Sequence, residues 1–81
     1  MTAKDASRIV MALRPNKTII ECLEFPDFYA FAMVDKGREG EWYLGGYWTV
    51  GKADGAIGDL RPVDDWDALS VIRQIDLAEL L

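Results

Sequence analysis

The segment that most constrains the fold is the run Phe-Tyr-Ala-Phe-Ala-Met-Val over residues 28–34. Both sets of alternating positions are apolar: Phe28, Ala30, Ala32 and Val34 on one side, Tyr29, Phe31 and Met33 on the other. A strand that is apolar on both faces lies inside a sheet and is covered on both sides. The flanking Pro26 and Gly37 and the aromatic content favour strand over helix. We therefore predict a central strand at 28–35.

Further strands are expected on both sides of this one. Residues 18–24 predict a strand with Ile20 and Cys22 on one face and Ile19 and Leu23 on the other. The segment 25–27 joins it to the central strand, because proline and aspartate favour turns.

The segment after the polar loop 36–41 predicts a hairpin. A third strand at 47–50 is entered through Gly45 and Gly46, and a short fourth strand at 56–60 follows the glycine-containing turn at 51–55. Whether residues 42–44 join the third strand is left open by the pattern.

Helices are expected at both ends. Thr2 is the predicted N-cap of an amphipathic helix over 2–14, which Pro15 ends. Its apolar face consists of Ala6, Ile9, Val10 and Leu13.

A second helix is predicted after Pro62. Asp64 or Asp65 would cap it. Its apolar face would consist of Trp66, Leu69, Ile72 and Ile75. The tail 76–81 either continues this helix or restarts it with Asp76 as a new cap.

This order predicts a single two-layer α+β domain over residues 1–81: helix, three- to four-stranded antiparallel meander, helix. Short connections between consecutive strands favour the antiparallel meander. Helices on one face of such a sheet make two layers.

The residue inventory argues against catalysis. Among 81 residues there is no His and one Cys, so His-ligated metals, His-based triads and an internal disulfide are excluded. Cys22 has no base beside it, and Glu21 and Glu24 would raise its pKa, so we expect a buried thiol. The glycine-containing loops lack a phosphate-binding motif, and the acids lack EF-hand spacing. We predict no catalytic residue, no cofactor, no metal and no enzymatic activity.

Charge divides the chain into unlike halves. Residues 1–40 carry six acids and six bases, whereas residues 41–81 carry eight acids and three bases, which accounts for the net charge of −5. Such a surface repels phosphate backbones, so we expect a basic protein partner and no nucleic acid. The sequence contains neither an 18-residue apolar run nor a secretory signal, so we expect no membrane association and a cytoplasmic location.

Aromatic side chains are the strongest indication of a contact surface. If helices cover only one face of the sheet, the other face exposes aromatic rings and marks a binding or self-association site. The alternative is that loop 36–46 or the C-terminal tail covers that face. The predicted contact residues are Trp42, Tyr43, Tyr47 and Trp48, with electrostatic support from Asp54, Asp59, Asp64 and Asp65.

Three stretches, residues 27–31, 45–52 and 55–57, together resemble small uncharacterised bacterial and phage or prophage α+β proteins, and the immunity-protein families of bacterial toxin systems. Those families place an aromatic strand, a Gly-Gly strand, a Lys–Gly turn and a short strand between two helices. They more often carry Asp before the turn lysine, where this chain has Gly51. The resemblance implies a non-enzymatic, immunity- or inhibitor-type binding protein. A homo-oligomeric structural or accessory protein is the alternative hypothesis.

Overall fold

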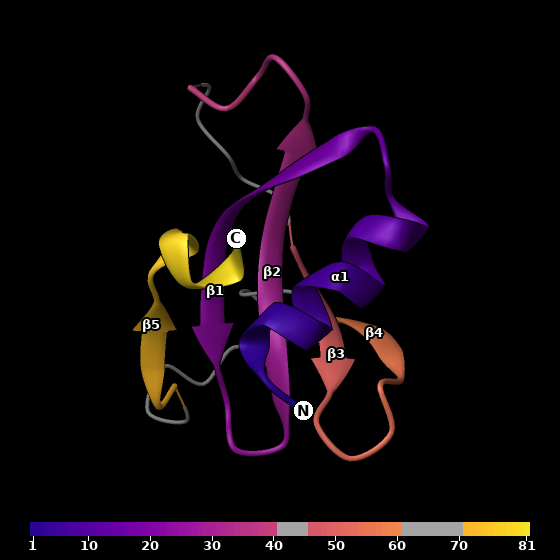
Figure 1. The fold of residues 1–81 in the computed structure, drawn as a ribbon, viewed down its shortest axis with the longest axis vertical. Coiled ribbons are helices and arrows are strands. Elements are labelled where there is room, and N and C mark those ends of the chain that lie inside the picture. Colours follow the sequence, from indigo (N-terminus) through magenta and orange to yellow (C-terminus); the bar gives the residue numbers. More distant parts are fainter. Residues whose placement is uncertain (41–45, 61–70) are drawn as a thin grey trace.

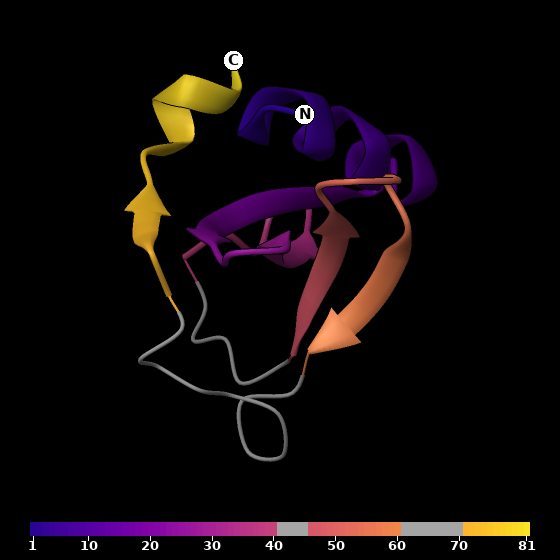
Figure 2. The same ribbon diagram turned by 90° about the horizontal axis from the view of Figure 1, so that it is seen from below.

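The computed structural model describes residues 1–40, 46–60 and 71–81. Within them, one α-helix packs on one face of a five-stranded antiparallel sheet with strand order β4-β3-β2-β1-β5 (Figures 1 and 2). The elements are α1 (Ala3–Leu13), β1 (Lys17–Glu24), β2 (Phe28–Asp35), β3 (Tyr47–Gly51), β4 (Ile57–Leu60), β5 (Arg73–Ile75) and the 3-10 helix η2 (Leu77–Leu80). The predicted α+β class and antiparallel sheet are confirmed.

Helix α1 begins where the sequence predicts. The Thr2 hydroxyl accepts a hydrogen bond from the Asp5 backbone N–H at 3.2 Å, and the Asp5 carboxylate accepts one from the Thr2 N–H at 3.3 Å. This reciprocal capping satisfies two otherwise unpaired donors. Ala6 and Val10 are buried against the sheet, whereas Leu13 is 50% exposed, so the buried stripe ends at Val10.

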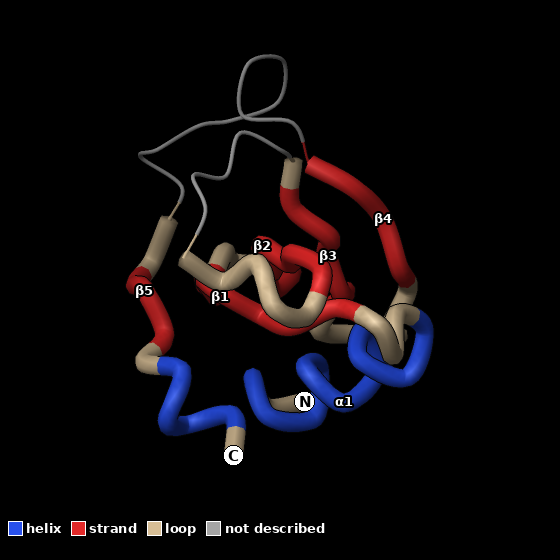
Figure 3. The backbone as a smooth tube through the Cα atoms, turned by 90° about the horizontal axis from the view of Figure 1, so that it is seen from above, coloured by secondary structure: helices blue, strands red, loops and turns tan. Residues whose placement is uncertain are grey.

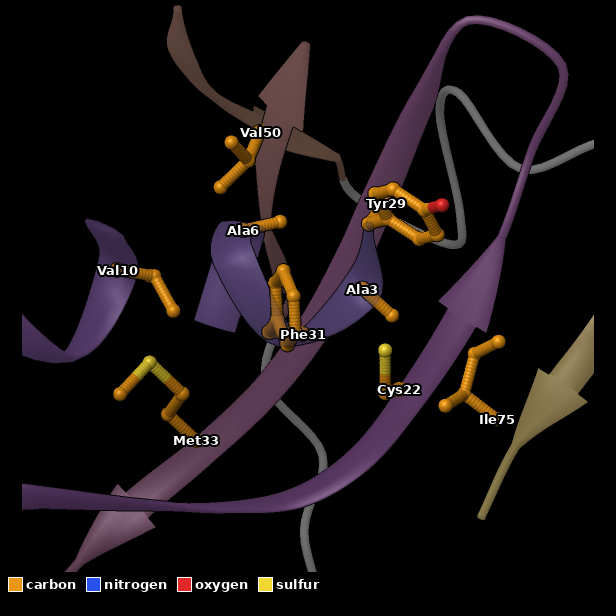
Figure 4. Close-up of a cluster of buried hydrophobic side chains, with 9 residues drawn as sticks. All are labelled: Ala3, Ala6, Val10, Cys22, Tyr29, Phe31, Met33, Val50 and Ile75. Atoms are coloured by element: carbon orange, nitrogen blue, oxygen red, sulfur yellow. The ribbon is translucent and has the colours of Figure 1, made fainter. Parts of the chain in front are cut away.

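The central-strand prediction for β2 is confirmed. It pairs with β1 on one side and with β3 on the other. Tyr29, Phe31 and Met33 point toward α1 and form a cluster beneath it, as Figure 4 shows. Ala30 lies on the opposite face and is fully buried.

A bulge in β1 changes the predicted faces of that strand. Ile19 pairs with Met33, but Glu21 pairs with Ala32, which leaves Ile20 without a partner in β2. One extra residue on one strand reverses the alternation beyond it. Ile19 therefore shares the helix-facing cluster with Cys22, and the prediction that pairs Ile19 with Leu23 is wrong.

The C-terminal region also differs from the prediction. Arg73–Ile75 forms β5, which pairs antiparallel with β1, so the sheet has five strands and not three or four. Ile75, expected on a helix face, is a strand residue opposite Cys22 and is 1% exposed. Pairing with β1 gives this apolar side chain a core position that local periodicity does not reveal.

Ile72, expected on the same helix face, lies in neither a helix nor a strand and is 57% exposed, so that part of the prediction is also wrong. The other residues named for this helix, Asp64, Asp65, Trp66 and Leu69, lie outside the described residues. The restart at Asp76 is present as the 3-10 helix η2, not as an α-helix. The Asp76 carboxylate caps it by accepting a hydrogen bond from the Ala78 N–H at 3.0 Å.

The second face of the sheet carries its own buried cluster. It contains Leu23, Phe25, Ala30 and Leu60, and Phe25 stacks on the half-buried Phe28 with ring centroids 4.6 Å apart. Of the two alternatives that the sequence leaves open, the described aromatic side chains of this face therefore favour a covered face over an exposed one.

An ion-pair network at one end of the sheet links β1 to the β3–β4 turn and to β5. Glu24 of β1 accepts from Lys52 Nζ at 2.7 Å and from Arg73 Nε at 3.1 Å. Arg73 also reaches Glu79 at 3.3 Å, and Lys52 lies 5.0 Å from the ring centroid of Tyr29. The bond from Lys52, followed by that from Arg73, holds the pKa of Glu24 below its ordinary value.

We expect Glu24→Gln to lower the free energy of unfolding by about 1–2 kcal/mol at neutral pH, because it removes the acceptor charge from two cations. A carboxylate whose pKa is lowered by folding stabilises above its unfolded pKa and loses that effect as pH falls through its folded pKa. The two proteins should therefore converge in urea unfolding at strongly acidic pH. Glu39→Gln, at an exposed position outside this network, is the control, and a constant difference at every pH would contradict this role.

Candidate functional site

Trp48 and Asp59 are the two predicted contact residues that the structure brings together. They are direct partners in the antiparallel ladder between β3 and β4. Their side chains lie on the same side of the sheet as α1, because Trp48 packs against the helix-facing cluster. Trp42, Tyr43, Asp64 and Asp65 lie outside the described residues.

The half-buried Trp48 also contacts a residue that sequence reasoning missed. The guanidinium carbon of Arg14 lies 4.4 Å from the centroid of the Trp48 ring, which is a cation–π arrangement. Arg14 is the C-cap of α1, and its Nη1 donates to the Leu13 carbonyl at 2.9 Å. The sequence signal that could have indicated Arg14 is its place at the predicted C-terminus of the helix, where the helix dipole stabilises a cation.

Tyr47 does not join Trp48 in one patch. Adjacent strand residues point to opposite faces, so Tyr47 lies with the second cluster. Its hydroxyl donates to Glu21 Oε2 at 2.9 Å, across the intervening β2. The predicted aromatic contact set is therefore divided between the two faces.

Asp54 serves the turn between β3 and β4. Its Oδ1 accepts from the Ala56 N–H at 2.9 Å, and the next residue, Gly55, has a φ of 69°. Side-chain capping and a left-handed glycine are the devices that reverse a chain tightly. The carboxylate remains exposed, but it has a local role that Asp59 lacks.

Asp59 is exposed on the outermost strand of the sheet. It forms no ion pair or side-chain hydrogen bond with any residue that the structure describes. Neighbouring Ile57 is 37% exposed. Figure 3 shows β4 at the margin of the sheet, and among the described strands only β3 pairs with it.

The outer edge of β4 presents backbone groups that no described strand pairs with. The Gly51 N–H donates to the Ala56 carbonyl at 2.9 Å, so position 51 on β3 and position 56 opposite it are a hydrogen-bonding position of the ladder. Such positions alternate along an antiparallel ladder, so Gly58 and Leu60 bond inward to β3. The N–H and C=O groups of Ile57 and Asp59 therefore point outward. We call Trp48, Ile57 and Asp59 the β4 contact surface.

Cys22 lies in the core, as expected. It is fully buried near Ile75, and burial raises the pKa of its thiol to about 12 (Figure 4). A thiol in that environment is a packing group and a poor nucleophile.

We expect native Cys22 to resist alkylation. A pKa near 12 in place of 9.0 leaves about a thousandfold less thiolate at mildly alkaline pH. Iodoacetamide labelling followed by mass spectrometry should therefore leave the folded chain unmodified and label the urea-unfolded chain at its one cysteine. Equal labelling rates in both states would contradict a buried thiol.

A groove of about 210 Å³ lies between α1 and η2 above β1. Its lining is Ser7, Met11, Thr18, Ile19, Leu77, Leu80 and Leu81, with no titratable side chain among them. The described residues also contain no group of three carboxylates or thiols arranged to hold a metal. The groove is lined mainly by apolar side chains, with the hydroxyl groups of Ser7 and Thr18 as its polar side-chain groups.

Comparison of the chain with protein-family models, curated proteins and solved structures yields no match. The resemblance to immunity-protein families therefore stays a prediction. Among the described residues, no helix has the length and apolar character that crossing a membrane requires.

Proposed function

We propose that this protein is a small, non-enzymatic binding module that acts by direct contact with a basic protein partner, in the manner of an immunity or inhibitor protein. The observation that carries the proposal is the carboxylate of Asp59 beside Trp48, on a sheet edge where no described residue pairs with the carboxylate or with the outer side of β4. Tryptophan is favoured at the energetic centre of interfaces, and neighbouring charge sets the choice of partner.

The distribution of charge supports a basic partner. The net charge of −5 arises entirely from residues 41–81, the half of the chain that carries the β4 contact surface. Uneven charge of one sign accelerates encounter with a surface of the opposite sign and repels phosphate backbones. The proposed setting is the bacterial cytoplasm, with the gene carried by a phage or prophage.

Affinity capture tests this function. The immobilised chain is exposed to a bacterial lysate beside three variants: Trp48→Ala, Asp59→Lys and the control Asp27→Lys. Asp27 is exposed in the β1–β2 turn, so its variant makes the same change in net charge away from β4. We expect Asp59→Lys to lower retention of a specific protein about tenfold or more, because it reverses the charge that the partner meets.

Folding and ionic strength complete the test. Urea unfolding of each variant separates lost contact from lost structure, since Trp48 also packs against the core. Salt should weaken the capture, because screening shortens the reach of surface charge. Retention of the same proteins by the wild type, Trp48→Ala and Asp59→Lys would refute the proposed function. Self-capture of a second copy would favour a homo-oligomer instead.

A further inference from the structure

We propose that β4 binds its partner by strand addition: an extended segment of a basic protein pairs antiparallel with β4 and places a cationic side chain opposite Asp59. This inference rests on the proposed function and specifies the partner's form. A partner strand would extend the sheet beyond β4 and use backbone groups that the sheet itself leaves free.

The backbone of β4 provides the hydrogen-bonding groups. Ile57 and Asp59 each turn one N–H and one C=O outward, and an antiparallel strand satisfies both groups of each residue. The two residues are separated by one position, which is the spacing of successive hydrogen-bonded pairs. A strand that meets both residues therefore forms two such pairs without distortion of β4.

The other edge of the sheet is less suited to a cationic strand. The charged side chain of β5 is Arg73, which is of the wrong sign and is already paired with Glu24 and Glu79. Asp59 is a carboxylate on β4 that forms no ion pair or side-chain hydrogen bond within the described ranges 1–40, 46–60 and 71–81. Charge complementarity therefore selects the β4 edge for a basic segment.

The same carboxylate disfavours a second copy of this chain. Antiparallel pairing of β4 with itself would bring together two acidic edges on molecules that each carry a net charge of −5. Charged side chains on an edge strand are a common protection against self-pairing. We infer that Asp59 selects between strands: it opposes an acidic copy and attracts a basic segment.

The side-chain pattern of the partner follows from the register. Ile57 and Asp59 point to the α1 side of the sheet, so the partner residues opposite them do the same. Gly58 between them has no side chain, and a Cβ there would lie 2.9 Å from Thr49 Oγ1. An antiparallel partner should thus carry a basic residue two positions before an apolar one, with free choice between them.

A peptide titration followed by amide NMR tests strand addition directly. The probe is the capped peptide Thr-Thr-Lys-Thr-Val-Thr-Thr, and its matched control has Glu in place of Lys. We expect the Lys peptide to shift the amide signals of Ile57 and Asp59 and to bind about fivefold more tightly than the Glu peptide. Asp59→Asn should remove that preference.

Ile57→Pro tests the backbone part of the proposal. Proline removes the outward N–H of Ile57 and is tolerated where that group faces solvent on an edge strand. We expect it to weaken Lys-peptide binding about tenfold or more, whereas Ile57→Val, which keeps the N–H, should bind as the wild type does. Equal binding by Ile57→Pro, or peptide shifts that avoid β4, would overturn strand addition.

Two further outcomes separate this inference from the proposed function. If lysate capture depends on Trp48 and Asp59 but is unchanged in Ile57→Pro, the binding module stands and strand addition is refuted. If β4 signals move with protein concentration alone, and this dependence is lost in Ile57→Pro, the occupant of the edge is a second copy. That result would overturn the basic-segment proposal.

Discussion

Phe31→Ala is expected to lower the free energy of unfolding by about 3–5 kcal/mol, the usual cost of removing a buried phenyl ring. Phe31 is fully buried on the central strand, with Cys22 and Trp48 as its ladder neighbours and α1 packed over it. A chain of 81 residues has a total stability of roughly 4–12 kcal/mol, so the variant should be near the limit of folding.

Urea unfolding followed by circular dichroism measures this effect. Leu13→Ala is the control, because it also truncates a large apolar side chain, but at a position that is 50% exposed. We expect the control to lose less than about 1 kcal/mol. Equal losses in the two variants would contradict the assignment of Phe31 to the core.

Ala30→Asp is expected to destabilise the opposite face by about 3–5 kcal/mol. Ala30 is fully buried in the second cluster beside Leu23, and a carboxylate there would be an unpaired buried charge. The three added heavy atoms also crowd this closely packed position, and both effects depend on Ala30 being buried.

Ala53→Asp is the matched control for this second substitution. Ala53 is exposed in the β3–β4 turn, so the same change in charge should alter stability by only about 0.5 kcal/mol. Urea midpoints measured at neutral pH compare the two variants. A small effect at Ala30 would show that the second face is open to water in solution.

Features set by local chemistry were predictable from the sequence. The Thr2 cap, the central strand at 28–35 and the glycine-containing turn after β3 were confirmed. Each depends on residues that are close in the chain: a hydroxyl three residues before its donor, an alternating apolar pattern, or a glycine with positive φ.

Features set by distant pairing were not predictable. The bulge at Ile20 arises from the register between β1 and β2, which no single strand specifies. The segment around Ile75 satisfies helical periodicity as well as strand alternation, and its pairing with β1 decides between them. A strand as short as β5, with three residues, offers too little local propensity to distinguish strand from helix.

The candidate site also combines features that the sequence predicts with features that depend on distant pairing. Trp48 and Asp59 were named from residue type, but their adjacency follows from the β3–β4 ladder. That Tyr47 faces away from Trp48 follows from alternation alone and was within reach of sequence reasoning. The free edge itself follows from strand order, since only the assembled sheet reveals which strand is outermost.

Hydrogen exchange of the β4 amides in the free protein tests the central claim, that this edge is open for pairing. We expect an alternating pattern: slow exchange at Gly58 and Leu60, which bond inward to β3, and fast exchange at Ile57 and Asp59, which point outward. The pattern should be the same at low and high protein concentration. Slow exchange at all four amides would mean that the edge is already occupied and would contradict the account.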